Sequence, residues 1–182
     1  MALIPNLLTL LRILLIPLFL YLVFFSQLNH RITIALIVFT LGALTDFLDG
    51  YLARKWKVIS DFGKIADPLA DKLLVLSALA GLTWLEPFRL FVLIFILIAL
   101  REAAITILRE VYKARGIIVP ADKLGKVKTF LQMTGIIAAY IIWIAHPHDL
   151  PRFYTIAAHV WFGLVAALTI YSGALYLKPQ TR

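Results

Sequence analysis

Residues 7–25 read LLTLLRILLIPLFLYLVFF, an apolar run in which Arg12 is the only charged residue. A helix needs roughly 20 residues to cross the hydrocarbon core of a bilayer, which is about 30 Å thick. The run is longer than the apolar core of a signal peptide, and no small-residue cleavage site follows it. It therefore predicts a membrane-spanning helix that is retained in the protein.

Five further apolar runs follow, and the six runs together predict an all-α membrane protein with six transmembrane helices. The predicted spans are residues 7–28, 32–51, 62–84, 88–108, 124–145 and 153–177. Pairs such as Asn29 with His30 and Glu86 with Pro87 supply turn chemistry between the spans. The connections are short, so residues 1–182 are predicted to form a single membrane domain.

The composition narrows the range of partners. With 62% hydrophobic and 15% charged residues, the chain is far more apolar than a soluble domain. Its formal net charge is +8, but Lys and Arg punctuate apolar runs instead of gathering on a soluble face, which argues against a nucleic-acid partner. Membrane lipid and phosphate-bearing substrates are the expected partners. Cysteine is absent, which excludes thiolate ligands and cysteine nucleophiles.

The basic residues also predict an orientation. If the amino terminus lies in the cytoplasm, all Lys and Arg except Arg31, Arg89 and Arg152 fall on the cytoplasmic side or at helix ends next to it. Because cytoplasmic connections carry an excess of Lys and Arg, both termini are predicted to be cytoplasmic. No transit peptide is visible, so the expected location is the cytoplasmic membrane of a bacterium.

Four aspartates stand in two short stretches, DFLDGYLAR at residues 46–54 and GKIADPLAD at residues 63–71. At about 100° per residue, Asp46 and Asp49 share a face of the second predicted helix. Asp67 and Asp71 share a face of the third in the same way. A short connection makes these helices antiparallel neighbours, so the four carboxylates are expected to meet near the cytoplasmic surface.

Four carboxylates at a membrane need compensation, because each costs roughly 2.5–3.5 kcal/mol at the centre of a helix and less near the headgroups. Asp oxygens suit a hard cation such as Mg²⁺, Mn²⁺ or Ca²⁺. Gly50, Ala53 and Gly63 would let a bulky substrate approach the backbone between the carboxylates. The alternative is that the aspartates cap helices and pair with nearby Lys and Arg. Four carboxylates at these spacings, interleaved with glycines, favour metal binding.

The two stretches together resemble the signature of the CDP-alcohol phosphotransferase family, D-x2-D-G-x2-A-R-x8-G-x3-D-x3-D, at every fixed position. The resemblance implies a six-helix enzyme, a homodimer, and Mg²⁺ or Mn²⁺ in a two-metal site. The implied metal ligands are Asp46, Asp49, Asp67 and Asp71, of which Asp71 is also the general base. The expected contacts with the CDP-lipid are Asn6, Thr9, Asp46, Asp49, Gly50, Ala53, Arg54 and Gly63.

Two of those contacts have an alternative role. Asn6 and Thr9 share a face of the first helix, where they could line the nucleotide. Asn6 could equally cap that helix, with the Thr9 hydroxyl bonded to a backbone carbonyl.

A second set of charges lies on the fourth and fifth predicted helices and is the expected binding site for an acceptor phosphate. Arg offers a fork of donors to phosphate and Lys a point charge. Anchoring to lipid headgroups is the alternative, but these residues lie within otherwise apolar helices, which favours a ligand role. The set consists of Arg101, Arg109, Lys126 and Lys128.

Three shorter motifs resemble the branch of the family that makes phosphatidylglycerophosphate. They are IPNLLTLLR at residues 4–12, the Arg101 and Glu102 pair, and GKVKT at residues 125–129. This resemblance implies transfer of a phosphatidyl group from CDP-diacylglycerol to sn-glycerol 3-phosphate, with release of CMP at the cytoplasmic face. Inositol phosphate, inositol and serine are the alternative acceptors.

Two functions of other classes also need consideration. An ion-coupled transporter would use intramembrane carboxylates too, but no inverted repeat is visible and the acidic residues lie near one face of the membrane. A noncatalytic membrane scaffold would not need the complete aspartate signature. The sequence therefore favours the enzyme.

Overall fold

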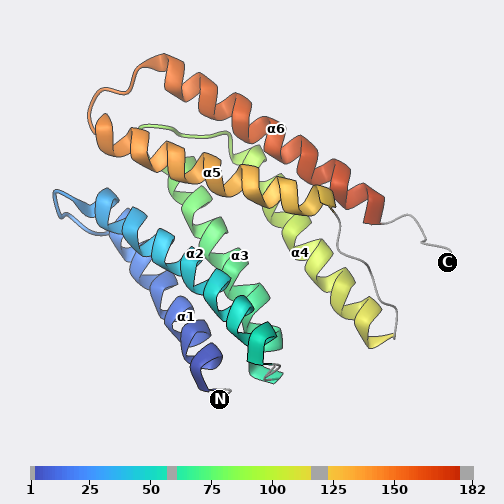
Figure 1. The fold of residues 1–182 in the computed structure, drawn as a ribbon. Coiled ribbons are helices and arrows are strands. Elements are labelled where there is room, and N and C mark those ends of the chain that lie inside the picture. The colour runs from blue at the N-terminus through green and yellow to red at the C-terminus, as the bar shows by residue number, and fades with distance from the viewer. Residues whose placement is uncertain (1–2, 57–60, 116–122, 177–182) are drawn as a thin grey trace. The chain divides into compact units, whose positions relative to one another are not determined.

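The computed structural model describes the backbone of residues 3–56, 61–115 and 123–176, where it forms six helices and no strand (Figure 1). Side chains are described in these ranges except at residues 3–6, 46–56, 61–65, 67–68, 113–114, 123 and 175–176. The all-α prediction is confirmed. The helices are α1 (Leu3–Phe24), α2 (Arg31–Trp56), α3 (Asp61–Trp84), α4 (Val92–Ala114), α5 (Lys123–Ala145) and α6 (Arg152–Tyr176).

The end of the first helix differs from the prediction. The predicted span continued to residue 28, whereas α1 ends at Phe24. The N–H of Ser26 donates back to the carbonyl of Tyr21 at 2.9 Å. Arg31 Nη1, at the start of α2, donates to the carbonyl of Val23 at 3.0 Å. The last carbonyls of α1 are thus bonded by a turn and by the next helix instead of by another helical turn.

The start of the fourth helix also differs. The predicted span began at residue 88, whereas α4 begins at Val92. Arg89 has a positive φ of 41°, outside the helical region, and the N–H of Leu90 donates to the carbonyl of Leu82 at 3.0 Å. Arg89 Nε also pairs with Glu86 Oε1 at 2.9 Å on the surface. This turn occupies residues that the hydropathy pattern assigned to a helix.

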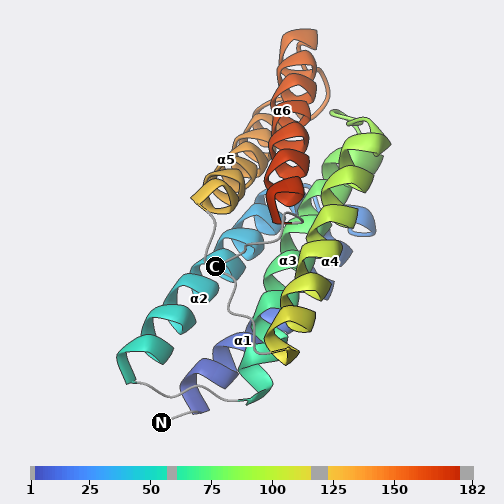
Figure 2. The same cartoon turned by 90° about the vertical axis from the view of Figure 1, so that its right-hand side faces the viewer.

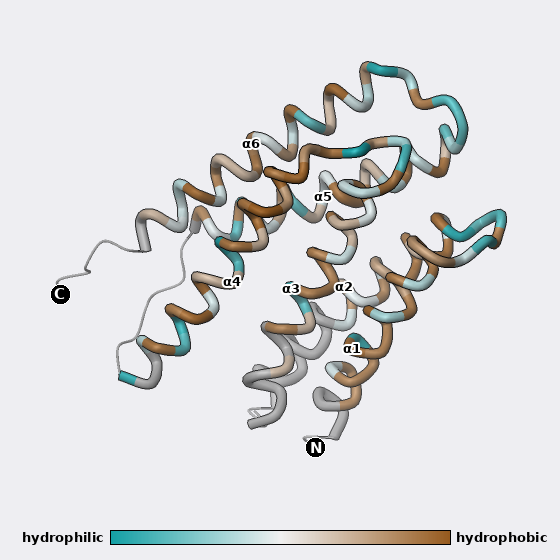
Figure 3. The backbone as a smooth tube through the Cα atoms, turned by 180° about the vertical axis from the view of Figure 1, so that it is seen from behind, coloured by the Kyte–Doolittle hydropathy of each residue, from teal (hydrophilic) through white to brown (hydrophobic). Residues whose placement is uncertain are grey.

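Three helices of the described chain are long and apolar enough to cross a membrane: α1 through Leu7–Phe24, α5 through Leu124–Ala145 and α6 through Arg152–Ala174. Figure 3 shows apolar residues along α1 and hydrophilic residues at the turn that joins it to α2. Large apolar side chains such as Leu14 and Leu164 are exposed on these helices. Soluble proteins seldom expose extended apolar surface, and lipid suits such a surface.

The chain forms two compact units, and α3 and α5 contribute residues to both. The first comprises Met1–Gly81 with Tyr140–Ala145, and the second comprises Leu82–Ala139 with His146–Arg182. In the first unit, α1 and α2 form an antiparallel pair (Figure 1). In the second, α4 packs against α6 (Figure 2), and Trp161 Nε1 of α6 donates to the carbonyl of Leu131 in α5 at 3.1 Å.

Gly81 lies at a close contact between helices in the first unit. A Cβ atom at this position would lie 2.9 Å from Val23 Cγ1 and would also meet the hydroxyl of Tyr140, which donates to the carbonyl of Ala78 at 3.2 Å. Val23 and Tyr140 are buried and have little room to move. We expect Gly81→Ala to lower the free energy of unfolding by about 1–3 kcal/mol.

Gly163→Ala is the matched control, because a Cβ atom added there would meet no described atom within 4 Å apart from its chain neighbours and the nearby backbone of its own helix. Ala favours a helix over Gly by about 1 kcal/mol. Thermal unfolding in detergent should give a lower Tm for Gly81→Ala and an unchanged or higher Tm for Gly163→Ala. Equal shifts in the two variants would contradict the close contact at Gly81.

Candidate active site

The four aspartates lie at the end of α2 and in the first half of α3. Positions three or four apart share a helix face, so the backbone places Asp46 beside Asp49 and Asp67 beside Asp71. The side chain of Asp71 is half-buried. The side chains of Asp46, Asp49 and Asp67 lie outside the described residues, as do the predicted donor-binding positions Asn6, Gly50, Ala53, Arg54 and Gly63.

Close contact between α2 and α3 occurs next to these aspartates. A Cβ atom at Gly42 would lie 2.6 Å from Leu74 Cδ2, so the absence of a side chain at Gly42 lets the two helices approach. Gly42 precedes Asp46 by four residues, and Leu74 follows Asp71 by three. Because consecutive helices joined by a short connection run antiparallel, both aspartates lie on the same side of this contact. The contact therefore places the backbone of the two carboxylate-bearing segments at the same end of this helix pair.

The first helix reaches the same point through Arg12. This arginine is fully buried, and its Nε donates to the carbonyl of Gly42 at 3.3 Å. Thr45 Oγ1 donates to the same carbonyl at 2.7 Å. Thr9, one turn before Arg12, is buried as well, at 1% exposure. Charged residues within membrane helices usually face the protein interior and mark functional sites, so Arg12 is a candidate site residue.

An apolar groove runs beside the carboxylate-bearing turn of α3. It has a volume of about 450 Å³ and lies between α1 and α3. Ala66 and Ala70 each directly precede an aspartate of the signature, Asp67 and Asp71. The lining residues are Ile13, Ile16, Pro17, Ala66, Leu69, Ala70 and Leu73.

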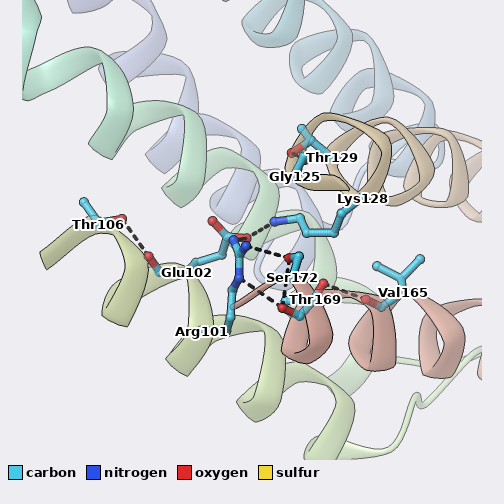
Figure 4. Close-up of polar contacts among 9 residues, drawn as sticks. All are labelled: Arg101, Glu102, Thr106, Gly125, Lys128, Thr129, Val165, Thr169 and Ser172. Carbon is cyan, nitrogen blue, oxygen red and sulfur yellow. Dashed lines mark hydrogen bonds and ion pairs between the residues drawn. The ribbon is translucent and has the colours of Figure 1, made fainter. Parts of the chain in front are cut away.

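The second unit contains a buried polar cluster formed by α4, α5 and α6 (Figure 4). Glu102 Oε1 on α4 accepts a hydrogen bond from Lys128 Nζ on α5 and lies 3.5 Å from Arg101 Nη1. Arg101 also reaches α6, where its Nε donates to the carbonyl of Thr169 at 3.1 Å and its Nη2 donates to Ser172 Oγ at 2.8 Å. Charges buried in this way are stable only when they are paired and hydrogen-bonded.

The four predicted phosphate ligands therefore fall into two pairs. Lys128 is buried, with its side chain only 4% exposed, and Arg101 is part-buried, with its side chain 12% exposed. Arg109 and Lys126 are exposed. One turn after Lys128, Gln132 is buried, and among the described residues its Nε2 has no hydrogen-bond partner.

Sequence reasoning assigned no role to Glu102, Thr169, Ser172 or Gln132. A signal existed for the two α6 residues, since a Thr and a Ser three positions apart in an apolar helix form a polar stripe. The sequence places Glu102 next to Arg101 in a short motif and indicates no further partner for it. Its partner Lys128 lies 26 residues away, and no local spacing predicts such a pairing.

The donor chemistry of the aspartate site fits a hard divalent cation. Carboxylates at helix positions three and four apart offer oxygen ligands only, and the chain has no cysteine. Such a donor set suits Mg²⁺ or Mn²⁺ better than zinc. Among the side chains that the structure describes, no three His, Cys, Asp or Glu residues gather closely enough to hold a metal ion, but that set includes only Asp71 of the predicted ligands.

Comparison with known proteins defines the class. The chain belongs to the CDP-alcohol phosphatidyltransferase family, whose sequence profile matches residues 2–171. It is therefore an enzyme of phospholipid biosynthesis, and with its three long apolar helices it is a membrane protein.

The names of individual relatives specify a reaction within this class. A "probable phosphatidylglycerophosphate synthase" of Mycobacterium tuberculosis is 35% identical over 97% of this chain and 81% of its own length. A "CDP-diacylglycerol--glycerol-3-phosphate 3-phosphatidyltransferase" of Rickettsia typhi is 34% identical over 96% and 94%. The Bacillus subtilis protein of the same name is 38% identical over 81% and 78%.

Proposed function

We propose that this enzyme transfers the phosphatidyl group of CDP-diacylglycerol to sn-glycerol 3-phosphate and produces phosphatidylglycerophosphate and CMP. The observation that carries the proposal is the similarity, over nearly the whole of both chains, to the Rickettsia typhi protein named for this reaction. Family membership also favours an enzyme over the transporter and scaffold alternatives.

In the proposed reaction, an acceptor hydroxyl attacks the phosphorus that bears the diacylglycerol. A new P–O bond forms, the bond from that phosphorus to the bridging oxygen of the pyrophosphate breaks, and CMP leaves with the bonding electron pair. We assign Asp71 as the general base that takes the hydroxyl proton during attack. The Asp71 side chain on α3 is half-buried, which is compatible with contact to a substrate.

Asp46, Asp49, Asp67 and Asp71 would hold Mg²⁺ or Mn²⁺ in a two-metal site. When bound, the metal neutralises pyrophosphate charge and makes CMP a better leaving group. The carboxylates would hold the metal between two helices that approach closely at Gly42.

The rest of the donor would be held by residues around the same helices. We propose that Asn6, Thr9, Gly50, Ala53, Arg54 and Gly63 contact the CDP moiety together with Asp46 and Asp49. The apolar groove between α1 and α3 would accommodate part of an acyl chain while the nucleotide stays at the membrane surface. No large extraction of the lipid from the bilayer would then be needed.

Arg101, Arg109, Lys126 and Lys128 are proposed to bind the phosphate of the acceptor. The part-buried Arg101 on α4 and the buried Lys128 on α5 support this assignment, as does the buried Gln132 donor one turn from Lys128. A buried donor without a partner costs about 1–3 kcal/mol, which a ligand or a bound water would recover.

The topology that goes with this proposal has six membrane spans and both termini in the cytoplasm. The active site would then face the cytoplasm at a bacterial cytoplasmic membrane, where sn-glycerol 3-phosphate enters from water. We also propose a homodimer, as the family resemblance implies. The three long apolar helices and the bacterial relatives support this location.

The acceptor can be tested by measuring CMP release from purified protein in detergent with CDP-diacylglycerol and Mg²⁺ or Mn²⁺. We expect turnover with sn-glycerol 3-phosphate and little with inositol phosphate, inositol or serine. A site built to bind a particular substrate group rejects analogues that lack this group by about 10⁴-fold. Inositol and serine lack the phosphate, so we expect them to be rejected in this way. Turnover with a different acceptor would preserve the aspartate chemistry but overturn the assignment of the acceptor.

A further inference from the structure

Glu102 is the central carboxylate of the cluster in Figure 4. A single oxygen, Oε1, accepts from Lys128 on α5 and lies within reach of Arg101 on α4. Neighbouring positions on a helix diverge by about 100°, so Arg101 and Glu102 converge only because both side chains turn toward the same point. One carboxylate oxygen thus joins cations from two helices, and Arg101 extends the connection to α6.

We infer that Glu102 is a positioning residue that holds Lys128 and Arg101 in the geometry needed to bind the acceptor phosphate. This inference rests on the proposed function, because it takes these two cations as phosphate ligands. Glu102 would act through them and would not contact the acceptor.

The need for such a residue follows from the surroundings. Long cationic side chains in apolar helices extend toward water or headgroups when nothing holds them. Two nearby cations also repel each other strongly where water is scarce. Lys128, which pairs with Glu102, is buried, and only 3% of the whole residue is exposed. A binding site needs its charges fixed to within about 0.5 Å before the ligand arrives, and the shared carboxylate supplies that restraint.

Arg101 is restrained from a second side by α6. Thr169 and Ser172 are fully buried, and their hydroxyls donate to the carbonyls of Val165 at 2.6 Å and Thr169 at 3.2 Å, which fixes the acceptors that Arg101 uses. A Cβ atom at Gly173 would lie 3.2 Å from Arg101 Cγ, so the glycine leaves room for the arginine stem.

The test is steady-state kinetics of CMP release by Glu102→Gln, which removes the charge and keeps the shape. We expect KM for sn-glycerol 3-phosphate to rise about tenfold or more, with KM for CDP-diacylglycerol nearly unchanged. Glu102→Asp, which keeps the charge but shortens its reach, should give an intermediate rise and serves if the Gln variant does not fold. Glu86→Gln is the matched control, because it breaks an exposed ion pair of the same unit and should leave both KM values unchanged.

A double variant shows whether Glu102 acts through Lys128. If it does, Glu102→Gln combined with Lys128→Met should raise the KM for the acceptor by much less than the product of the two single effects, because only the part that acts through Arg101 remains. A lower Tm with both KM values unchanged would show a purely structural role and overturn the inference. A fall in KM would also overturn it, because Glu102 would then compete with the acceptor phosphate. Failure of the proposed function is seen separately, as wild-type protein that does not turn over sn-glycerol 3-phosphate.

Discussion

Asp71→Asn is expected to lower kcat by about 10²–10⁴-fold, because the amide cannot take a proton from the attacking hydroxyl. The substitution conserves size, and Ala70 and Leu74 beside it remain to bury the same face of α3. The fold should therefore persist, with an unchanged helical circular dichroism spectrum and a Tm close to that of the wild type. Initial rates of CMP release at saturating concentrations of both substrates measure the loss.

Two comparisons give this result its meaning. Asp149→Asn removes an exposed carboxylate from the connection between α5 and α6 and should leave kcat unchanged. Because Asp71 is also proposed to lie at the metal, the Asn variant should be assayed over a range of metal concentrations. Activity that stays low at all of them supports a role as base, whereas recovery at high metal would reduce Asp71 to a metal ligand. Near-normal activity throughout would exclude it from the chemistry.

Removing divalent metal is expected to lower turnover about as much as Asp71→Asn does. Stabilisation of the pyrophosphate by metal is worth several kcal/mol, and each 1.36 kcal/mol is a factor of ten, so a chelator should reduce turnover by about 10³-fold or more. Mg²⁺ or Mn²⁺ added in excess of the chelator should restore it. Turnover that persists after exhaustive chelation would contradict the assignment of the four aspartates.

Variants at the aspartates connect that result to particular residues. Asp46→Asn and Asp67→Asn each remove one anionic oxygen from a proposed ligand, so both should need more metal for half-maximal activity. Asp149→Asn should show the wild-type requirement. If the metal requirement of Asp46→Asn and Asp67→Asn equals that of the wild type, the ligands lie elsewhere in the chain.

The six helices could be predicted because each apolar run is long and is followed by residues that favour turns. The ends were harder to place. α1 ends at Phe24, where Arg31 of the next helix bonds the carbonyl of Val23, and residue 88 lies in a turn in which Arg89 adopts a positive φ. Both effects depend on contacts or backbone angles that hydropathy does not report.

The candidate site also has features that the sequence predicts and features that depend on tertiary contacts. Spacings of three and four residues placed Asp46 with Asp49 and Asp67 with Asp71, because helix periodicity alone determines a shared face. The approach of α2 to α3 at Gly42, and the position of Arg12 there, depend on packing among three helices. The pairing of Arg101 with Ser172 spans 71 residues and required the structure.

The shared oxygen of Glu102 has a consequence for how such enzymes diversify. Changing Glu102 alone leaves two cations without their common counter-ion, and changing Lys128 alone leaves part of a buried carboxylate's charge unbalanced. Either single step is costly, so this cluster should change through paired substitutions whose effects are strongly non-additive. With the proposed role of this cluster in acceptor binding, a new acceptor preference would require coupled mutations on α4 and α5, a constraint that independent surface charges would not impose.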